Sequence, residues 1–226
     1  MPRITLSFDN GPDPEVTPRV LDVLDKAGLR ASFFVLGDKL RDRARRAVCE
    51  RARNEGHWIG NHTFNHIVPL GLSPDPNIAT KEIGRTQELL GNLSDERRLF
   101  RPFGGGGNLG KHLLNRWSLD FLVAGEYTCV LWNVIPADWE DPDGWVERGL
   151  EQCFAIDWAL VVLHDLATGA MDQLERFIEM ARENGATFVH DFPPECVPLV
   201  RGHVVTPMEP YVADPGLSQH VHDEGR

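Results

Sequence analysis

The sequence predicts an α/β domain built on a parallel sheet. Segments with the hydrophobic pattern of a strand and segments with that of a helix alternate about seven times along the 226 residues. No low-complexity linker or internal repeat interrupts them. A helix between two strands returns the chain to the same edge of the sheet through a right-handed crossover, so the strands should be parallel. The alternation leaves open whether the sheet is flat or closed into a barrel. The length and the hydrophobic fraction of 42% suit one domain with a sizeable core.

The expected elements follow from hydrophobic periodicity. Ile4, Leu6 and Phe8 alternate with polar residues as in a strand, and the later strands are continuous apolar runs typical of a buried parallel sheet. These runs cover residues 31–37, 56–61, 99–100, 129–134, 159–164 and 186–189. Apolar residues at helical spacing predict helices over residues 15–26, 38–55, 74–90, 142–154 and 171–183. Residues 1–200 are expected to form the domain. Residues 201–226, rich in Pro, His, Gly and Asp, are expected to form an extended or disordered tail.

Charge and composition limit the partners. The formal net charge of −11 disfavours nucleic acid and anionic membranes, because both would be repelled. No apolar run approaches the roughly 20 residues of a membrane-spanning helix. The first residues lack the pattern of a secretory signal, and the cysteines lack paired spacing, so we expect a cytoplasmic protein with reduced thiols. The sequence is compatible with a homo-oligomer and does not fix the oligomeric state.

Polar side chains stand where several predicted strands end. Asp9 and Asn10 follow the first strand, His62 and His66 follow the third, and His164 ends a later buried strand. The carboxyl ends of parallel strands are where ligands bind in such folds. Two histidines four residues apart can share a metal if the segment between them is helical. Taken singly, each position also fits an Asx turn, a surface histidine or a core histidine.

Five short motifs in chain order resemble those of the polysaccharide deacetylase family, also called the NodB-homology or carbohydrate esterase family 4 fold. They are Phe8-Asp9-Asn10-Gly11-Pro12, Asn61-His62-Thr63-Phe64-Asn65-His66, Phe100-Arg101-Pro102-Phe103-Gly104, Asp138-Trp139 and Leu163-His164-Asp165. The resemblance implies a distorted (β/α) barrel of about seven parallel strands. It also implies hydrolysis of an amide bond, most simply removal of an acetyl group from the nitrogen of an N-acetylated sugar.

The resemblance implies a catalytic role for four residues. Asp9 would be the general base, and Arg101 would hold it ionised through the opposite charge. His164 would be the general acid for the departing nitrogen, oriented by Asp138. Histidine suits this role because its unperturbed pKa of about 6.5 lies near neutrality.

The resemblance implies a divalent metal, most simply zinc, on His62, His66 and Asn10. The family has a second Asp where this chain has Asn10, and a neutral amide oxygen binds a dication more weakly than a carboxylate. We therefore expect weak or altered metal binding first. A metal-independent amidohydrolase of small ring amides, similar to allantoinase and the cyclic-imide hydrolases, is the second hypothesis. A catalytically inactive carbohydrate-binding module is the third.

The resemblance implies substrate contacts by Phe103, Trp139 and Leu163. In the family, the backbone N–H at the position of Phe103 helps to hold the oxyanion, while Trp139 and Leu163 would form walls of the pocket. The chain is one residue shorter than the family pattern between Arg101 and the aromatic residue, so the match at Arg101 is the firmer one.

Overall fold

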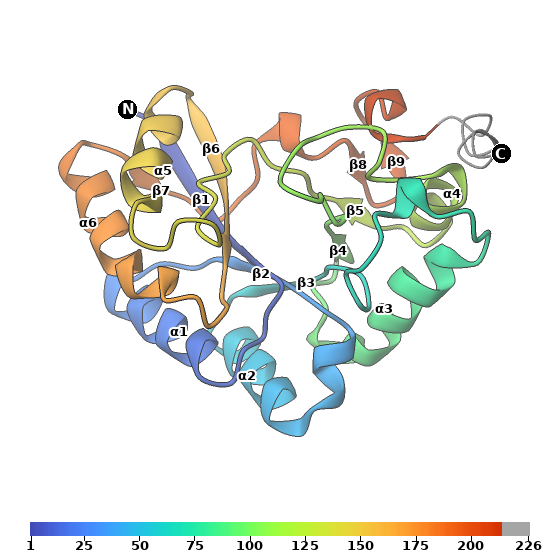
Figure 1. Ribbon diagram of the computed structural model, residues 1–226, viewed down its shortest axis with the longest axis horizontal. Helices are drawn as coiled ribbons and strands as arrows, with labels where there is room; N and C mark the ends of the chain where they lie inside the picture. Colours follow the sequence, from blue (N-terminus) through green and yellow to red (C-terminus); the bar gives the residue numbers. More distant parts are fainter. Residues whose placement is uncertain (214–226) are drawn as a thin grey trace, which may run out of the picture.

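The computed structural model describes residues 1–213, and in this part of the chain the strands form one curved sheet (Figure 1). Its order is β6-β1-β2-β3-β4-β5-β8-β9, and β7 pairs with the first residues of β1. The strands are β1 (Arg3–Asp9), β2 (Ser32–Val35), β3 (Trp58–Asn61), β4 (Leu99–Phe100), β5 (Thr128–Cys129), β6 (Trp158–His164), β7 (Thr187–Phe188), β8 (Leu199–Val200) and β9 (His203–Val204).

The helices cover the outer side of this sheet. The α-helices are α1 (Val16–Ala27), α2 (Arg43–Asn54), α3 (Arg85–Leu90), α4 (Arg116–Ala124), α5 (Trp145–Phe154) and α6 (Leu174–Glu183). The shorter helical turns are η1 (Asp38–Arg41), η2 (Leu70–Leu72), η3 (Thr80–Gly84), η4 (Gly91–Leu93), η5 (Ala170–Gln173), η6 (Pro194–Cys196) and η7 (Glu209–Tyr211). Figure 1 shows α1, α2 and α3 along one side, α5 and α6 beside β6 and β1, and α4 near β5.

The predicted distorted barrel of about seven parallel strands is confirmed. All pairings among β1 to β7 are parallel, while β5–β8 and β8–β9 are antiparallel. After β5 the chain continues to Val134, which forms a parallel bridge with Val161 of β6. This bridge brings the two ends of the parallel set together, so the sheet curls toward a closed barrel.

The expected strand over 129–134 is shorter in the structure, and one helix was not expected. The strand itself covers only Thr128–Cys129. The Val130 N–H still donates to the Phe100 carbonyl of β4 at 2.8 Å, but the carbonyls of Val130 and Leu131 accept hydrogen bonds from the Arg101 guanidinium and not from a neighbouring strand. Helix α4 lies in a stretch for which we predicted no helix. Its start carries an N-cap signal, since the Asn115 side chain accepts the N–H of Ser118 at 2.9 Å.

The two faces of β1 separate the core from the barrel interior. Ile4, Leu6 and Phe8 belong to the cluster between sheet and helices, as the alternation predicts. The polar face is also buried from Thr5 to Asp9, because it points into the interior of the curled sheet. There the Ser7 hydroxyl donates to the carbonyl of Val161 at 2.7 Å. This pattern carries the side chain after Ser7 on the same face, Asp9, into the barrel mouth.

The C-terminal segment lies on the domain as far as residue 213. The β8–β9 hairpin pairs with β5 through Leu199, Met208 is buried, and Val212 forms a bridge with Leu114. The predicted boundary after residue 200 therefore falls inside a hairpin, because the free edge of β5 offers backbone groups for pairing. Residues 214–226 of the predicted tail lie outside the described residues.

Two further observations concern the helices and the thiols of the described residues. No helix in residues 1–213 is long and apolar enough to cross a membrane. The cysteines at positions 49, 129, 153 and 196 are free and buried, as expected. Burial raises the pKa of Cys129, Cys153 and Cys196 to about 12, so these thiols stay protonated and unreactive near neutrality.

Candidate active site

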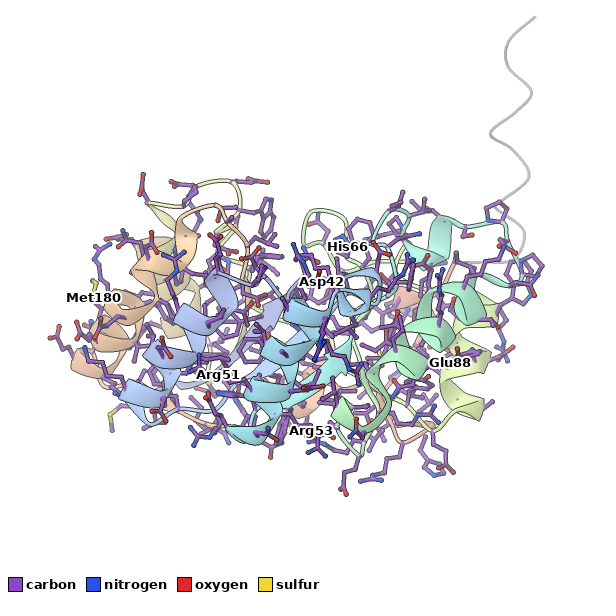
Figure 2. The ribbon with its side chains drawn as sticks, turned by 90° about the horizontal axis from the view of Figure 1, so that it is seen from below. Asp42, Arg51, Arg53, His66, Glu88 and Met180 are labelled. Atoms are coloured by element: carbon purple, nitrogen blue, oxygen red, sulfur yellow. The ribbon has the colours of Figure 1, made fainter. Side chains whose placement is uncertain are left out.

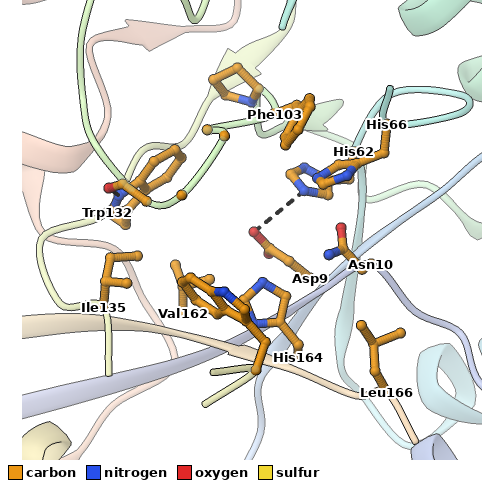
Figure 3. A pocket seen from close by; sticks show the side chains of 16 residues that line it. Asp9, Asn10, His62, His66, Phe103, Trp132, Ile135, Val162, His164 and Leu166 are labelled. Atoms are coloured by element: carbon orange, nitrogen blue, oxygen red, sulfur yellow. Dashed lines mark hydrogen bonds and ion pairs between the residues drawn. The ribbon is translucent and has the colours of Figure 1, made fainter. Parts of the chain in front are cut away.

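The carboxyl ends of the strands surround a cavity of about 300 Å³ (Figure 3). The predicted site residues that line it are Asp9, Asn10, His62, His66, Phe103, Trp139 and His164. Arg101 and Asp138 are fully buried and contact the cavity through Asp9 and His164. The structure thus brings nine of the ten predicted residues to one place, and Leu163 is the exception.

Arg101 fixes the position of the Asp9 carboxylate. Its Nη1 donates to Asp9 Oδ1 and to Ser7 Oγ, both at 2.8 Å. Its Nε and Nη2 donate to the carbonyls of Val130 and Leu131, both at 3.3 Å. The guanidinium has no room to move away, because it is fully buried and every one of these bonds is to a strand or its continuation. Such a charge-assisted pair holds a carboxylate in one orientation.

The electrostatics of the cavity keep Asp9 ionised. Burial raises the pKa of Asp9, but the charge of Arg101, together with its hydrogen bond and with His164, outweighs burial and holds the pKa of this carboxyl below its usual value. Asp9 Oδ2, the oxygen that Arg101 does not bind, is directed into the cavity toward His62 (Figure 3). Asp9 is therefore a carboxylate with one oxygen available to accept a proton.

Asp138 orients His164. Its Oδ1 accepts the Nδ1–H of His164 and its Oδ2 accepts the His164 backbone N–H, both at 2.9 Å. Burial lowers the pKa of His164, but the hydrogen bond and charge of Asp138, with Asp9 and Asp165, raise it above its usual value. The edge of the ring meets Trp139, with centroids 4.8 Å apart. Nε2 is left as the nitrogen that can give a proton to a substrate in the cavity.

His62 presents a lone pair to the cavity. Its Nδ1 lies 2.9 Å from the carbonyl oxygen of Arg101, which can only accept, so Nδ1 carries the proton. In the neutral ring Nε2 is then unprotonated, and it lies 3.6 Å from Asp9 Oδ2. Burial lowers the pKa of His62 and lowers that of His66 to about 3, so both rings are neutral. The two ring centroids are 4.9 Å apart.

Asn10 completes a donor set for a cation. Its backbone is left-handed, with φ of 70°, and its side-chain oxygen Oδ1 is buried without a hydrogen-bond partner among the described residues. This oxygen faces the two imidazoles in Figure 3. An unpaired buried acceptor costs about 1–3 kcal/mol, and a bound cation would remove this cost. Two neutral imidazoles and an amide oxygen fit a zinc-like divalent ion, although residues 1–213 hold no cluster of three His, Cys, Asp or Glu.

Comparison with known proteins decides the family. The sequence profile described as polysaccharide deacetylase matches residues 1–115. The chain belongs to the polysaccharide deacetylase family. PdaC, a peptidoglycan-N-acetylmuramic acid deacetylase of Bacillus subtilis, is 32% identical over 189 residues, which are 82% of this chain and 37% of that protein. A peptidoglycan-N-acetylglucosamine deacetylase of Bacillus cereus is 31% identical over 186 residues, which are 79% of this chain and 78% of that protein.

A solved structure of the polysaccharide deacetylase family agrees with the fold. A family 4 acetyl xylan esterase from Clostridium thermocellum, in complex with a cobalt ion, superposes with a TM-score of 0.67 and 25% identity. The match covers 83% of this chain and 87% of that one. This chain spans about a third of the length of PdaC and most of the length of the other two proteins. The family resemblance expected from the five motifs is confirmed.

Leu163 is not a wall of the cavity, which corrects the prediction for this member of the family. It points to the other face of β6 and belongs to the cluster between sheet and helices. Side chains of a strand alternate between its faces, so the residue that shares a face with His164 is Val162. Val162 and Leu166 line the cavity in its place (Figure 3). The two-residue period of the strand could have found Val162 from the sequence.

A glycine loop with two packed side chains forms a further wall that sequence reasoning missed. Residues 104–107 line the cavity beside Trp132 and Ile135. A Cβ at Gly104 would lie 2.7 Å from the Trp132 ring, and Gly107 has φ of 86° with Ile135 at 2.9 Å from its added Cβ. Trp132 Nε1 donates to the Gly107 carbonyl at 2.7 Å. Four consecutive glycines signalled a loop, but their role as a wall depends on these distant partners.

Exchange of Asn10 for Asp tests the proposed cation site. A unit charge added at about 4 Å from another charge is worth about 1–4 kcal/mol at effective dielectric constants of 80–20. We therefore expect Asn10→Asp to lower the Kd for Zn²⁺ by about tenfold or more, as measured by calorimetric titration. Asn65→Asp, at an exposed position on the same loop as His66, controls for added charge outside the donor set. Equal affinity in Asn10→Asp and wild type would remove Asn10 from the site.

Asp165 lies behind the first motif as a buried acid with a raised pKa. The side chain is fully buried, Thr17 Oγ1 donates to its Oδ2, and its Oδ1 has no partner among the described residues. Burial raises the pKa of Asp165 to about 7. Its carboxyl fills the space where a Cβ on Gly11 would stand, at 2.3–2.6 Å, so only glycine fits there.

The raised pKa of Asp165 predicts a pH-dependent stability. Between pH 4 and 7 the folded state keeps this proton while the unfolded state loses it, so the free energy of unfolding falls as pH rises. Asp165→Asn has no such proton to lose, so its free energy of unfolding should exceed that of wild type by on the order of 4 kcal/mol at pH 8. At pH 4 the free energies of unfolding of the two proteins should differ little. Urea unfolding from pH 4 to 8 measures it. The exposed Asp157→Asn is the control, and parallel pH profiles of Asp165→Asn and wild type would contradict the assignment.

Proposed function

We propose that the protein removes the N-acetyl group from an N-acetylated sugar or oligosaccharide, with Asp9 as general base and His164 as general acid. The observation that carries the proposal is that one cavity holds a carboxyl group and an imidazole whose pKa values are shifted in opposite directions. Asp9 has a lowered pKa and His164 a raised one. A base with a lowered pKa and an acid with a raised pKa can act together near neutral pH. The names of the peptidoglycan deacetylases among its relatives support this substrate class.

The proposed reaction needs two proton transfers. Asp9 Oδ2 takes a proton from water while the water oxygen bonds to the amide carbon. The C–N bond then breaks, and the departing nitrogen takes the proton of His164 Nε2, so that acetic acid and a free amine leave. The acetic acid ionises to acetate in solution, and Asp9 loses and His164 regains a proton by exchange with solvent. Arg101 keeps Asp9 in place through both steps, because its bond goes to the other carboxylate oxygen, Oδ1. Asp138 stabilises the charged imidazole before the proton is given.

A divalent ion held by His62, His66 and Asn10 would supply Lewis acidity toward the amide carbonyl and the water. The cobalt ion of the acetyl xylan esterase structure supports a metal of this kind in the family. Zinc fits the nitrogen-rich donor set. The neutral Asn10 oxygen makes weak binding the expected case.

Acetate release tests the function. The purified chain should release acetate from N-acetylglucosamine oligomers, and addition of Zn²⁺ or Co²⁺ should increase the rate. Turnover of cyclic ureides or imides without turnover of the oligomers would replace the proposal by the ring-amide hypothesis. Binding of the oligomers without release of acetate, with or without metal, would favour an inactive binding module. The cytoplasmic location and the compatibility with a homo-oligomer remain predictions from the sequence.

A further inference from the structure

Glu82 contacts the loop that carries His66 from outside the cavity. It lies in η3, a π-helical turn, and only 7% of the residue is exposed. Its Oε2 accepts the backbone N–H groups of Phe64 and Asn65, at 2.8 and 3.1 Å. These two residues immediately precede His66. A carboxylate that accepts two amide protons holds them with charge-assisted bonds, which are stronger than bonds to a neutral acceptor.

The loop held by Glu82 has an unfavourable backbone. Thr63 and His66 are left-handed, with φ of 69° and 55°, a conformation that side chains other than glycine seldom adopt. Such a conformation persists only where the surrounding structure enforces it. The orientation of the His66 ring therefore depends on what fixes the backbone at both ends of this loop.

A second set of bonds ties the start of the loop to the same helical turn. Asn61 Oδ1 accepts the N–H of Thr63 at 3.0 Å, and Asn61 Nδ2 donates to the carbonyl of Ile83 at 2.9 Å. The neighbouring Glu82 carbonyl accepts the Thr86 hydroxyl at 2.8 Å. The π-helical turn thus presents a carboxylate and a carbonyl to one loop, and turns of this kind occur frequently at functional sites.

We propose that Glu82 is a positioning residue that sets the orientation of His66 and thereby the affinity of the site for a divalent ion. The proposal rests on the proposed function in so far as His66 is a metal ligand. Glu82 does not line the cavity. It acts through the amides of Phe64 and Asn65. Partners behind a metal ligand typically change metal affinity or activity by about 10–100-fold when they are removed.

Two variants of Glu82 separate the effect of its hydrogen bonds from the effect of its side-chain size. Glu82→Met keeps the length of the side chain but cannot accept either amide proton, whereas Glu82→Gln keeps an oxygen in the same place. Glu88→Gln makes the same charge change at an exposed position of α3 (Figure 2). With Co²⁺ as the probe, we expect Glu82→Met to raise the Kd by about 10–100-fold and to change the visible spectrum of the bound ion. Glu82→Gln should recover most of the affinity, and Glu88→Gln should equal wild type.

Amide hydrogen exchange gives a readout that needs no metal. Exchange at Phe64 and Asn65 should be faster in Glu82→Met than in wild type, and close to wild type in Glu82→Gln. A folded Glu82→Met with unchanged Kd, spectrum and exchange would overturn the proposal. If wild type binds no Co²⁺, the metal part of the proposed function fails. The positioning role is then decided by exchange and kcat, and it is overturned if neither changes. If Glu82→Met does not fold, Glu82→Asp, whose oxygen is withdrawn by one methylene, takes its place in the same measurements.

Discussion

Asp9→Asn should lower kcat/KM for an N-acetylglucosamine oligomer by about 10²–10⁴-fold, the usual contribution of a positioned general base. The amide has the shape of the carboxylate but cannot take the proton of the attacking water. The exchange also leaves the buried Arg101 guanidinium without its anionic partner. In wild type, Arg101 Nη1 lies 2.8 Å from Asp9 Oδ1. Acetate release at several substrate concentrations measures the change, and the loss should fall on kcat because Asp9 acts in the chemical step.

The control for Asp9→Asn is Asp25→Asn, an exposed position in α1. Thermal unfolding of both variants shows whether the unpaired Arg101 has unfolded the protein. Only a folded Asp9→Asn variant tests the role of Asp9 as general base. A folded Asp9→Asn that keeps wild-type kcat would show that another group accepts the proton. The mechanism proposed for this cavity would then be wrong.

Asp138→Asn should also lower kcat by about 10²–10⁴-fold, through the protonation of His164. In wild type, Asp138 accepts two hydrogen bonds from His164, one from the backbone N–H and one from Nδ1–H. An Asn that keeps its oxygen on the backbone N–H turns its NH₂ toward Nδ1. The ring then adopts the other tautomer, and the imidazolium loses its anionic partner. The general acid is lost although the cavity keeps its shape.

The pH profile of Asp138→Asn gives a second measurement. Wild-type kcat/KM should rise with pH as Asp9 ionises and fall as His164 loses its proton above a raised pKa. Without the charge of Asp138, burial dominates and the pKa of His164 falls, so the basic limb moves to lower pH. Asp143→Asn, an exposed position in the same loop, should leave the profile unchanged. A basic limb at the wild-type pH in Asp138→Asn would show that His164 is not the group that titrates there.

The strand ends could be found from the sequence, but the residue that holds the His66 loop from behind could not. Asp9 and His164 were predicted at strand ends, and the structure pairs them directly across β1 and β6. Leu163 was placed in the pocket on the strength of its motif, although the two-residue period of a strand assigns that place to Val162. Glu82 carries no local signal at all, because its function depends on a loop 17 and 18 residues away.

The sequence by itself determined most of the order of strands and helices along the chain, although not α4 or the β8–β9 hairpin. It also determined the family and the identity of the ionisable groups in the cavity. These follow from local periodicity and from short motifs, which do not depend on what lies across the barrel. Only the tertiary structure decided how those groups behave. The pKa of Asp9 is low because Arg101, 92 residues away, is buried against it. The Asn10 oxygen is a candidate ligand because folding leaves it buried and unpaired, and burial and charge partners are properties of the assembled fold.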